Sequence, residues 1–413
     1  MNAKHAHEPI SVAEALRRLE AVVAPAAAVE AALEACHGLV LAEDVTADRD
    51  FPPTDRSAMD GFAVRSADAA SAGVVLAVSG EVRAGQDALG TEVAPGQAVR
   101  VFTGSVLPSG ADAVVMVEHV EEDRGARTVR LERPVESAQH LRRQSSDLAR
   151  DAVLLRAGSP IHAAEIAALA AVGRTRVRVH RPPVVGVLST GDEVVEVDRV
   201  PRPHQVRNSN AATLLAQARE TGVRGAYLGH APDTRDDLHE RIERGLAGDV
   251  LLVTGGVSVG DYDLVAAALG EFGAEVLFHG VRMKPGMPVL AARRGNCLIF
   301  GLPGNPVSAF TCFAVLVAPS LRRMLGYRTW RDVLVAVRLD GAIEARPGRE
   351  TYHLAYVTWH EGRPSARRVD TTGSGDLPAL ARANAFLVTP AEGGSWDEGE
   401  ELPALLWPEA RRR

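Results

Sequence analysis

Cysteine and aromatic residues are scarce in this sequence, and its basic residues do not outnumber its acidic ones. Its 413 residues include three cysteines, Cys36, Cys297 and Cys312, whose spacing matches neither a zinc site nor a redox pair. Aromatic residues make up 4% of the chain, and 46 basic residues face 53 acidic ones, for a net charge of −7. Because nucleic-acid binding needs clustered positive charge and aromatic side chains for base stacking, we expect no nucleic-acid partner.

Long apolar runs are also absent. The longest, Ala309 to Ala318, is too short to cross a bilayer, and the first nine residues lack the apolar segment of a secretory signal. Among 13 histidines the only close pair is His5 and His7, which argues against a histidine metal site. We therefore expect a cytoplasmic protein that does not contact a membrane.

Residues 249–263 carry the strongest positive signal, with the sequence D-V-L-L-V-T-G-G-V-S-V-G-D-Y-D. The apolar run 250–253 predicts a strand that is buried on both faces. Gly255 and Gly256 follow it, and residues without a Cβ atom let backbone N–H groups approach a ligand closely. In open α/β sheets, ligands bind at this carboxyl end of the strands.

Two further stretches repeat this arrangement. Residues 184–188 predict a strand that ends in S-T-G-D-E, and residues 297–300 predict one that ends in G-L-P-G-N-P. Asn305 is expected to be an N-cap, with Pro306 at the first helical position. Such a helix start offers unpaired N–H groups and the positive end of a dipole to an anion. The region therefore predicts an α/β sheet whose strand ends share one ligand site.

The rest of the chain alternates between helical and β-rich segments. Residues 26–41 are expected to form a helix that turns into extended chain at Gly38, and residues 162–172 a further helix. Short strands are expected over 74–135 and from about 328 onward. The expected helix caps are Ser11 in a capping box with Glu14, Ser209 or Asn210, Asp233 or Thr234, and Asp261 or Asp263.

The chemistry that these turns favour is phosphate binding. Backbone amides and a helix start suit a phosphate, and carboxylates beside it suit Mg²⁺, which prefers oxygen ligands. The sequence has neither a P-loop motif nor a G-x-G-x-x-G turn after a strand, which disfavours two common nucleotide folds. This reasoning predicts a phosphorylated or nucleotide-bearing ligand without identifying the reaction.

The ordered set of motifs resembles a known family. The motifs are S-A-M-D-G-F-A, T-G-S-V-L-P-S-G-A-D-A-V-V, S-T-G-D-E, T-G-G-V-S-V-G-D-Y-D, K-P-G-M-P and G-L-P-G-N-P-V-S-A. Together, over roughly residues 11 to 400, they resemble the molybdopterin molybdenumtransferase family, which is shared with the C-terminal domain of gephyrin.

The resemblance implies a multidomain α/β plus β fold, in which a central α/β molybdopterin-binding domain has flanking β domains and the protomer is elongated. Residues 1–25 with 147–180 would form a discontinuous helical linking domain. Residues 26–146 would form a β-rich domain with the S-A-M-D-G loop. Residues 181–327 would form the α/β domain, and 328–413 a small C-terminal β domain.

The resemblance also implies an activity. The enzyme would insert molybdate into adenylylated molybdopterin and release AMP and molybdenum cofactor, with Mg²⁺ as cofactor. It would be a homodimer whose site is shared between subunits, with a transient contact to the molybdopterin adenylyltransferase. Two alternatives remain open from the sequence: adenylyl transfer to molybdopterin, and a non-catalytic pterin-binding scaffold.

Site residues follow from the matched motifs, position by position. The resemblance implies catalytic roles for Asp60, Thr103, Asp147, Lys284 and Ser374. It implies ligand binding by Ser57, Thr190, Gly255, Gly256, Ser258, Pro303, Gly304, Asn305 and Pro306, and metal binding by Glu193, Asp233 and Asp263. Gly280 and Met287 stand where the family often has basic residues, which leaves Lys284 as the main expected cation.

Overall fold

The computed structural model describes residues 8–232, 234–256, 264–408 and 410. The chain forms two compact units. The first comprises Met1–Glu43, Ala157–His162 and Arg176–Arg413, and the second comprises Asp44–Arg156 and Ala163–Thr175.

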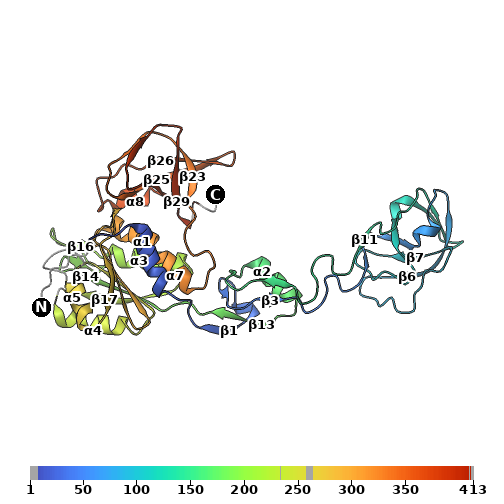
Figure 1. The fold of residues 1–413 in the computed structure, drawn as a ribbon, viewed down its shortest axis with the longest axis horizontal. Coiled ribbons are helices and arrows are strands. Elements are labelled where there is room, and N and C mark those ends of the chain that lie inside the picture. The colour runs from blue at the N-terminus through green and yellow to red at the C-terminus, as the bar shows by residue number, and fades with distance from the viewer. Residues whose placement is uncertain (1–7, 233, 257–263, 409, 411–413) are drawn as a thin grey trace. The chain divides into compact units, whose positions relative to one another are not determined.

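A six-stranded sheet in the order β17-β14-β18-β22-β21-β19 forms the centre of the first unit (Figure 1). The strands from β17 to β22 run parallel, and β21 and β19 add antiparallel pairings. All five residues of β18 are buried, which confirms the strand predicted from the apolar run. The strand bounds are Val185–Thr190 for β14, Gly225–Ala231 for β17, Val250–Thr254 for β18, Glu275–His279 for β19, Leu290–Arg294 for β21 and Cys297–Leu302 for β22.

Helices cover both faces of this sheet, which explains why its central strands are apolar on both sides. Leu251 and Val253 face the core under α4 (Arg235–Gly245) and α5 (Leu264–Glu271). Val250 and Leu252 face the core formed with α1 (Val12–Val22), α3 (Ser209–Glu220), α6 (Pro306–Cys312) and α7 (Ala318–Met324). The predicted α/β architecture is therefore confirmed.

The apolar run Ala309 to Ala318 lies within one long helix. α6, a π-helical segment over Phe313–Val317 and α7 form one continuous helix, Pro306–Met324, of 19 residues. Its length and composition alone would suit a membrane span, but 78% of its most apolar window is buried inside the protein. It is a core helix of the first unit.

The predicted second helix over residues 26–41 is wrong up to Gly38, whereas the extended chain predicted beyond it is confirmed by β2. This segment forms β1 (Ala28–Ala32), a 3₁₀ turn (Leu33–Ala35) and β2 (Val40–Leu41). Both strands pair antiparallel with β13 (Arg176–His180), a partner far away in the sequence. A distant strand therefore overrides the helical preference of the alanine-rich segment.

The predicted helix caps are partly confirmed. Ser11 Oγ accepts a hydrogen bond from Glu14 N, although the Glu14 carboxylate binds Arg17 and Arg18 instead of closing the capping box. The cap of α3 is Asn208, so the prediction of Ser209 or Asn210 is wrong. Thr234 occupies the N-cap position of α4. Asp233, Asp261 and Asp263 lie outside the described residues.

The C-terminal part of the first unit is a closed β-barrel. Its sheet order is β20-β25-β26-β23-β29-β27, and a pairing between β25 and β27 closes five of these strands into a ring. The bounds are Met283–Lys284 for β20, Val335–Leu339 for β23, Glu350–His360 for β25, Arg363–Arg368 for β26, Ala385–Thr389 for β27 and Glu401–Leu406 for β29, with α8 over Leu377–Ala381. This confirms the predicted β-rich C-terminal segment.

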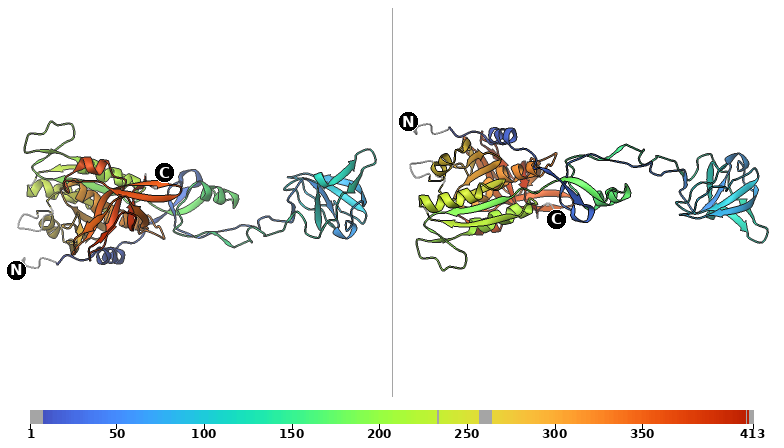
Figure 2. Two further views of the ribbon diagram at one scale, coloured as in Figure 1. Left: turned by 90° about the horizontal axis from the view of Figure 1, so that it is seen from above. Right: turned by 90° about the horizontal axis from the view of Figure 1, so that it is seen from below.

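The second unit contains a six-stranded sheet in the order β8-β5-β7-β6-β10-β9, coloured from blue to teal in Figure 2. Its central strands are buried on both faces: Phe62 and Val64 face one core, and Ala63 faces the other. The bounds are Gly61–Val64 for β5, Val75–Val82 for β6, Gln97–Val101 for β7, Ala113–Met116 for β8, Val120–Asp123 for β9 and Thr128–Leu131 for β10. The predicted helix near 162–172 is α2, Ala163–Ala171.

A half-buried ion pair ties the start of β14 to the start of β18. Two guanidinium nitrogens of Arg181 donate to the two carboxylate oxygens of Asp249, each at 2.7 Å, and Val184 N donates to the same carboxylate. These hydrogen bonds, Arg181 first, lower the pKa of Asp249 below its ordinary value. We expect Asp249→Asn to lower the free energy of unfolding by about 2 kcal/mol at pH 7, because Arg181 loses its charged partner.

This loss should depend on pH. A carboxyl group whose pKa is lowered in the folded state stabilises the fold above its unfolded pKa of about 4, and this contribution disappears as pH falls through the folded pKa. Urea unfolding of wild type and Asp249→Asn from pH 7 to pH 3 should show the two curves converging. Asp198→Asn, whose ion pair is exposed, is the control and should cost almost nothing at any pH. A pH-independent difference would contradict the ionic origin.

Candidate functional site

A cavity of about 780 Å³ lies at the carboxyl ends of β14, β18 and β22, where the sequence predicted a ligand site. This volume is typical of sites for small-molecule ligands and cofactors. The polar and glycine residues that line it are Ser189, Thr190, Glu193, Arg207, Asn208, Ser209, Asn210, Thr254, Gly255, Gly256, Gly304, Asn305 and Gly375.

Glycine is required at the end of β18 because another strand end lies against it. Gly255 has φ +95°, and a Cβ atom there would lie 2.5 Å from the carbonyl oxygen of Thr190. Thr190 is itself 2% exposed, and its hydroxyl has no hydrogen-bond partner among the described residues. A buried polar atom without a partner is costly unless a ligand or water satisfies it, so this part of the cavity is suited to a polar ligand.

Two asparagines at the start of α3 hold the cavity together, and neither was predicted from the sequence to belong to the site. Asn208 Oδ1 accepts from Ser189 Oγ and from Ala211 N, each at 3.1 Å. Asn210 Nδ2 donates to Thr254 Oγ1 and to the carbonyl oxygen of Gly304, each at 2.8 Å. Asn210 therefore links the turn after β18 to the turn after β22. The N-S-N triplet at the predicted start of a helix was the available signal.

The structure brings most of the predicted ligand-binding residues into this cavity. Thr190, Gly255, Gly256, Pro303, Gly304, Asn305 and Pro306 all line it. Ser374 lies beside it, because its hydroxyl accepts from Asn305 Nδ2 at 2.9 Å. Ser258 lies outside the described residues.

Lys284, the expected cation, is in a different position. It is exposed on β20, which pairs with β25 of the barrel through Lys284 and Thr351. It is not among the cavity-lining residues, and the only basic side chain among the described residues that do line it is Arg207. The positive charge of Lys284 instead adds to the burial that lowers the pKa of His353 to about 4.

Glu193 is the one predicted metal ligand within the described part of the chain, since Asp233 and Asp263 fall outside it. Its carboxylate lines the cavity and folds back over Gly191. The described residues contain no group of three candidate ligands for a metal. The Glu193 carboxylate nevertheless offers an oxygen donor of the kind that Mg²⁺ takes, so this much of the predicted set fits a magnesium ion.

The second unit joins two of the predicted catalytic residues directly. Thr103 donates to Asp60 Oδ1 from both its main-chain N and its hydroxyl, each at 2.7 Å. These bonds, the main-chain one first, hold the pKa of Asp60 below its ordinary value, and Arg100 adds to the shift. Asp60 is therefore an ionised, exposed carboxylate at neutral pH. Gly61 next to it is required by packing, because a Cβ there would lie 1.9 Å from the carbonyl oxygen of Val115.

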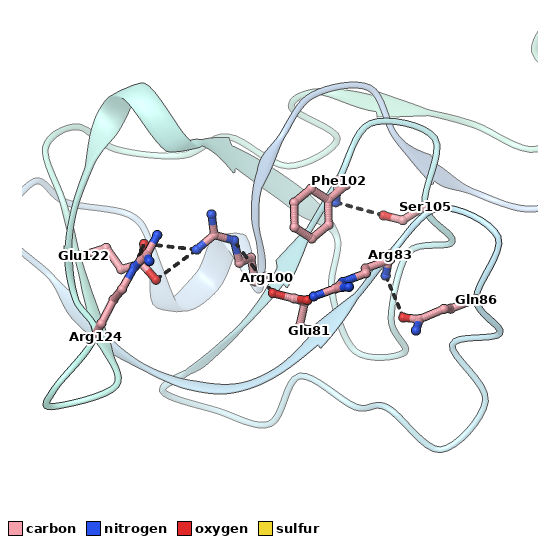
Figure 3. A network of polar contacts seen from close by, with 8 residues as sticks. All are labelled: Glu81, Arg83, Gln86, Arg100, Phe102, Ser105, Glu122 and Arg124. Atoms are coloured by element: carbon pink, nitrogen blue, oxygen red, sulfur yellow. Dashed lines mark hydrogen bonds and ion pairs between the residues drawn. The ribbon is translucent and has the colours of Figure 1, made fainter.

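Arg100 is a further residue of this region that the sequence did not single out (Figure 3). Its guanidinium carbon lies 5.8 Å from the ring centre of Phe62 and 5.6 Å from that of Phe102. Phe62 is two residues after Asp60, and Phe102 directly precedes Thr103. Arg100 also pairs with Glu122 at 3.0 Å (Figure 3). The arginine therefore packs against one aromatic residue close to each member of the Asp60–Thr103 contact.

Ser57 and Asp147 lie in neighbouring parts of the second unit. Ser57 is 1% exposed, and its hydroxyl donates to the carbonyl oxygen of Met59 at 2.5 Å. Asp147 forms an ion pair with Arg142, and β11 (Leu141–Arg142) pairs with β4 (Arg56–Ser57). In this arrangement Ser57 shapes the loop that carries Asp60, whereas Asp147 is an exposed carboxylate already paired with a cation.

Three family profiles match the chain. "MoeA N-terminal region (domain I and II)" matches residues 10–173, "Probable molybdopterin binding domain" matches 186–323, and "MoeA C-terminal region (domain IV)" matches 336–407.

Similar proteins cover nearly the whole chain. The molybdopterin molybdenumtransferase of Bacillus subtilis (strain 168) is 36% identical over 404 residues, which are 96% of this chain and 94% of that protein. The protein of the same name from Nostoc sp. is 36% identical over 386 residues, 91% of this chain and 88% of that protein. The solved structure of the molybdopterin biosynthesis moeA protein from Pyrococcus horikoshii OT3 has a TM-score of 0.83 and 29% identity, covering 97% of this chain and 100% of that one.

Proposed function

This chain belongs to the molybdopterin molybdenumtransferase family, and we propose that the cavity at the ends of β14, β18 and β22 binds adenylylated molybdopterin. The protein is a transferase of molybdenum cofactor biosynthesis that acts on molybdopterin and molybdate. The observation that carries the cavity assignment is the convergence of two glycine turns and the unpartnered Thr190 hydroxyl in one space.

The alternatives weighed from the sequence are not favoured. The adenylyltransferase hypothesis accounts for the α/β domain alone, and the scaffold hypothesis does not account for the transferase name that the relatives carry. The relatives named for molybdenum transfer align over 96% and 91% of this chain, including the β-rich regions on either side of that domain.

The cavity can be tested by equilibrium binding. Titration calorimetry with AMP and with adenylylated molybdopterin should show binding of both to the wild-type protein, with the pterin nucleotide binding more tightly because it fills more of the space. Absence of binding by either ligand would contradict the assignment.

We propose that Glu193 contributes to a magnesium site in the same cavity. When bound there, Mg²⁺ would offset the negative charge of the ligand's phosphate groups, and Glu193 would supply a carboxylate oxygen to it. We expect Glu193→Gln to weaken the binding of Mn²⁺, used as a spectroscopic substitute for Mg²⁺, by about tenfold or more.

Electron paramagnetic resonance titration of free Mn²⁺ measures this directly in the presence of AMP. Glu240→Gln, an exposed residue of α4 that does not line the cavity, is the control. Equal Mn²⁺ affinity in wild type and Glu193→Gln would exclude Glu193 as a ligand.

We also propose a homodimer in which Asp60 and Thr103 of one subunit act on the ligand held by the cavity of the other. This proposal rests on the family resemblance and on the two separate clusters, one in each compact unit, that carry the predicted catalytic and binding residues. The four-domain division, a cytoplasmic location and a transient contact with the adenylyltransferase remain proposals on the same basis.

Mixed dimers test the shared site. If Asp60→Asn and Gly255→Ala subunits, each inactive alone, are unfolded, mixed in equal amounts and refolded, half of the dimers should be mixed. One of the two sites in each mixed dimer would be wild type, so about a quarter of wild-type activity should return. No recovery, once subunit exchange has been verified by mass spectrometry, would indicate a site built within one chain.

A further inference from the structure

The described residues that line the cavity include few charged side chains. Among the described residues that line it, Glu193 is the acidic one and Arg207 the basic one. Both side chains are exposed, and within the described part of the chain no ion pair joins them. A cation that a protein leaves unpaired in a ligand cavity is available to an anionic ligand.

Arg207 is held in place by its own backbone and by one of its side-chain nitrogens. It lies in β16 (Val206–Arg207), which pairs with β15 (Val194–Val195) through Arg207 and Val195. The next residue, Asn208, is 4% exposed and donates its main-chain N–H to the carbonyl oxygen of Val195 at 2.8 Å. Arg207 Nε donates to the carbonyl oxygen of Arg199 at 3.0 Å. Within the described residues, the two terminal guanidinium nitrogens have no hydrogen-bond partner.

We propose that Arg207 binds the phosphate of the nucleotide part of the substrate through these two terminal nitrogens. This inference rests on the proposed function of the cavity and adds to it the residue that recognises the charge. A guanidinium group presents two parallel donors to two phosphate oxygens, a geometry that a lysine cannot reproduce. The positive charge of Arg207 also explains how the cavity attracts an anionic ligand although Lys284 does not line it.

The test compares AMP with adenosine, which differ by the phosphate. Calorimetric titrations are made with wild type, Arg207→Ala, Arg207→Lys and Arg202→Ala. Arg202 lies five residues earlier in the same exposed loop and does not line the cavity, so it is the matched control. Circular dichroism melting curves verify that each variant is folded.

We expect Arg207→Ala to weaken AMP binding by about tenfold, since a charge-assisted hydrogen-bonded contact is lost at an exposed site. Arg207→Lys should be intermediate, and Arg202→Ala should match wild type. Adenosine should bind all four proteins equally. Added salt should weaken AMP binding to the wild type more than to Arg207→Ala, because the screened contact is already missing in the variant.

Each other outcome has a defined meaning. Equal AMP affinity in wild type and Arg207→Ala would overturn the role of Arg207 while leaving the cavity assignment intact. Equal losses for AMP and adenosine would also overturn it, since the residue would then support the cavity without contacting the phosphate. Failure of the wild type to bind AMP would overturn the cavity assignment and, with it, the role of Arg207.

Discussion

Asp60→Asn is expected to lower the rate of molybdenum insertion by at least about 100-fold while leaving the fold intact. The carboxylate accepts two hydrogen bonds from Thr103 and is ionised at neutral pH, because those bonds lower its pKa. Asparagine keeps the size of the side chain, and its amide oxygen can accept both hydrogen bonds from Thr103, so the substitution removes only the charge. The side chain is exposed and no core residue depends on it, so stability should change little.

The measurement is AMP release from adenylylated molybdopterin at saturating molybdate, with melting temperature as the test of folding. Asp123→Asn is the matched control, since Asp123 is also an exposed carboxylate of the second unit that accepts a main-chain N–H, from Ala126 at 2.9 Å. It should retain full activity. Because the pKa of Asp60 is lowered, its protonation should reduce activity only below the pH range in which an ordinary aspartate titrates. A folded Asp60→Asn protein with wild-type turnover would rule out a catalytic role.

Gly255→Ala is expected to abolish ligand binding and to destabilise the first unit by about 2 kcal/mol or more. Two effects combine at this position. The residue has φ +95°, which L-residues rarely adopt, and the added Cβ would lie 2.5 Å from Thr190 O and 2.9 Å from Thr190 Oγ1. Relief of this overlap requires the ends of β14 and β18 to separate, which changes the shape of the cavity between them.

Gly273→Ala separates the two effects. Gly273 also has a positive φ of +68°, but no atom lies within 4 Å of an added Cβ. It should cost about 1 kcal/mol through backbone strain alone and leave binding unchanged. Urea unfolding gives the stabilities and calorimetry gives the affinities for adenylylated molybdopterin. If Gly255→Ala behaved like Gly273→Ala in both measurements, the close approach at Thr190 would be irrelevant to the site.

Local sequence patterns were sufficient to predict two kinds of element. One kind pairs with neighbours close in the sequence, and the other has a composition that is typical of a single type of secondary structure. The short apolar run of β18, which is rich in β-branched residues, indicated a buried strand, and the glycines after it indicated a close backbone approach. The motif order then indicated the family. The segment 26–41 was misjudged because its strands exist only by pairing with β13, more than a hundred residues away, and no local pattern contains that partner.

The positions of the charged residues also could not be predicted from local sequence patterns. The sequence placed Lys284 in the cavity because its motif resembled the family's, but β20 pairs with β25 of the barrel and the lysine lies on that sheet. Arg207 carried no motif and was missed, although it lines the cavity. Contact between Asp60 and Thr103 joins residues 43 positions apart, so the resemblance could suggest this pair, whereas the spacing alone could not.

The most direct test of the central claim is a single-turnover assay with purified protein, adenylylated molybdopterin and Mg²⁺, with and without molybdate. AMP and the metal content of the product are measured together. Molybdenum insertion predicts that AMP appears in a one-to-one ratio with molybdenum bound to the pterin, and that this yield depends on molybdate. AMP release that is independent of molybdate, with no metal on the pterin, would contradict it.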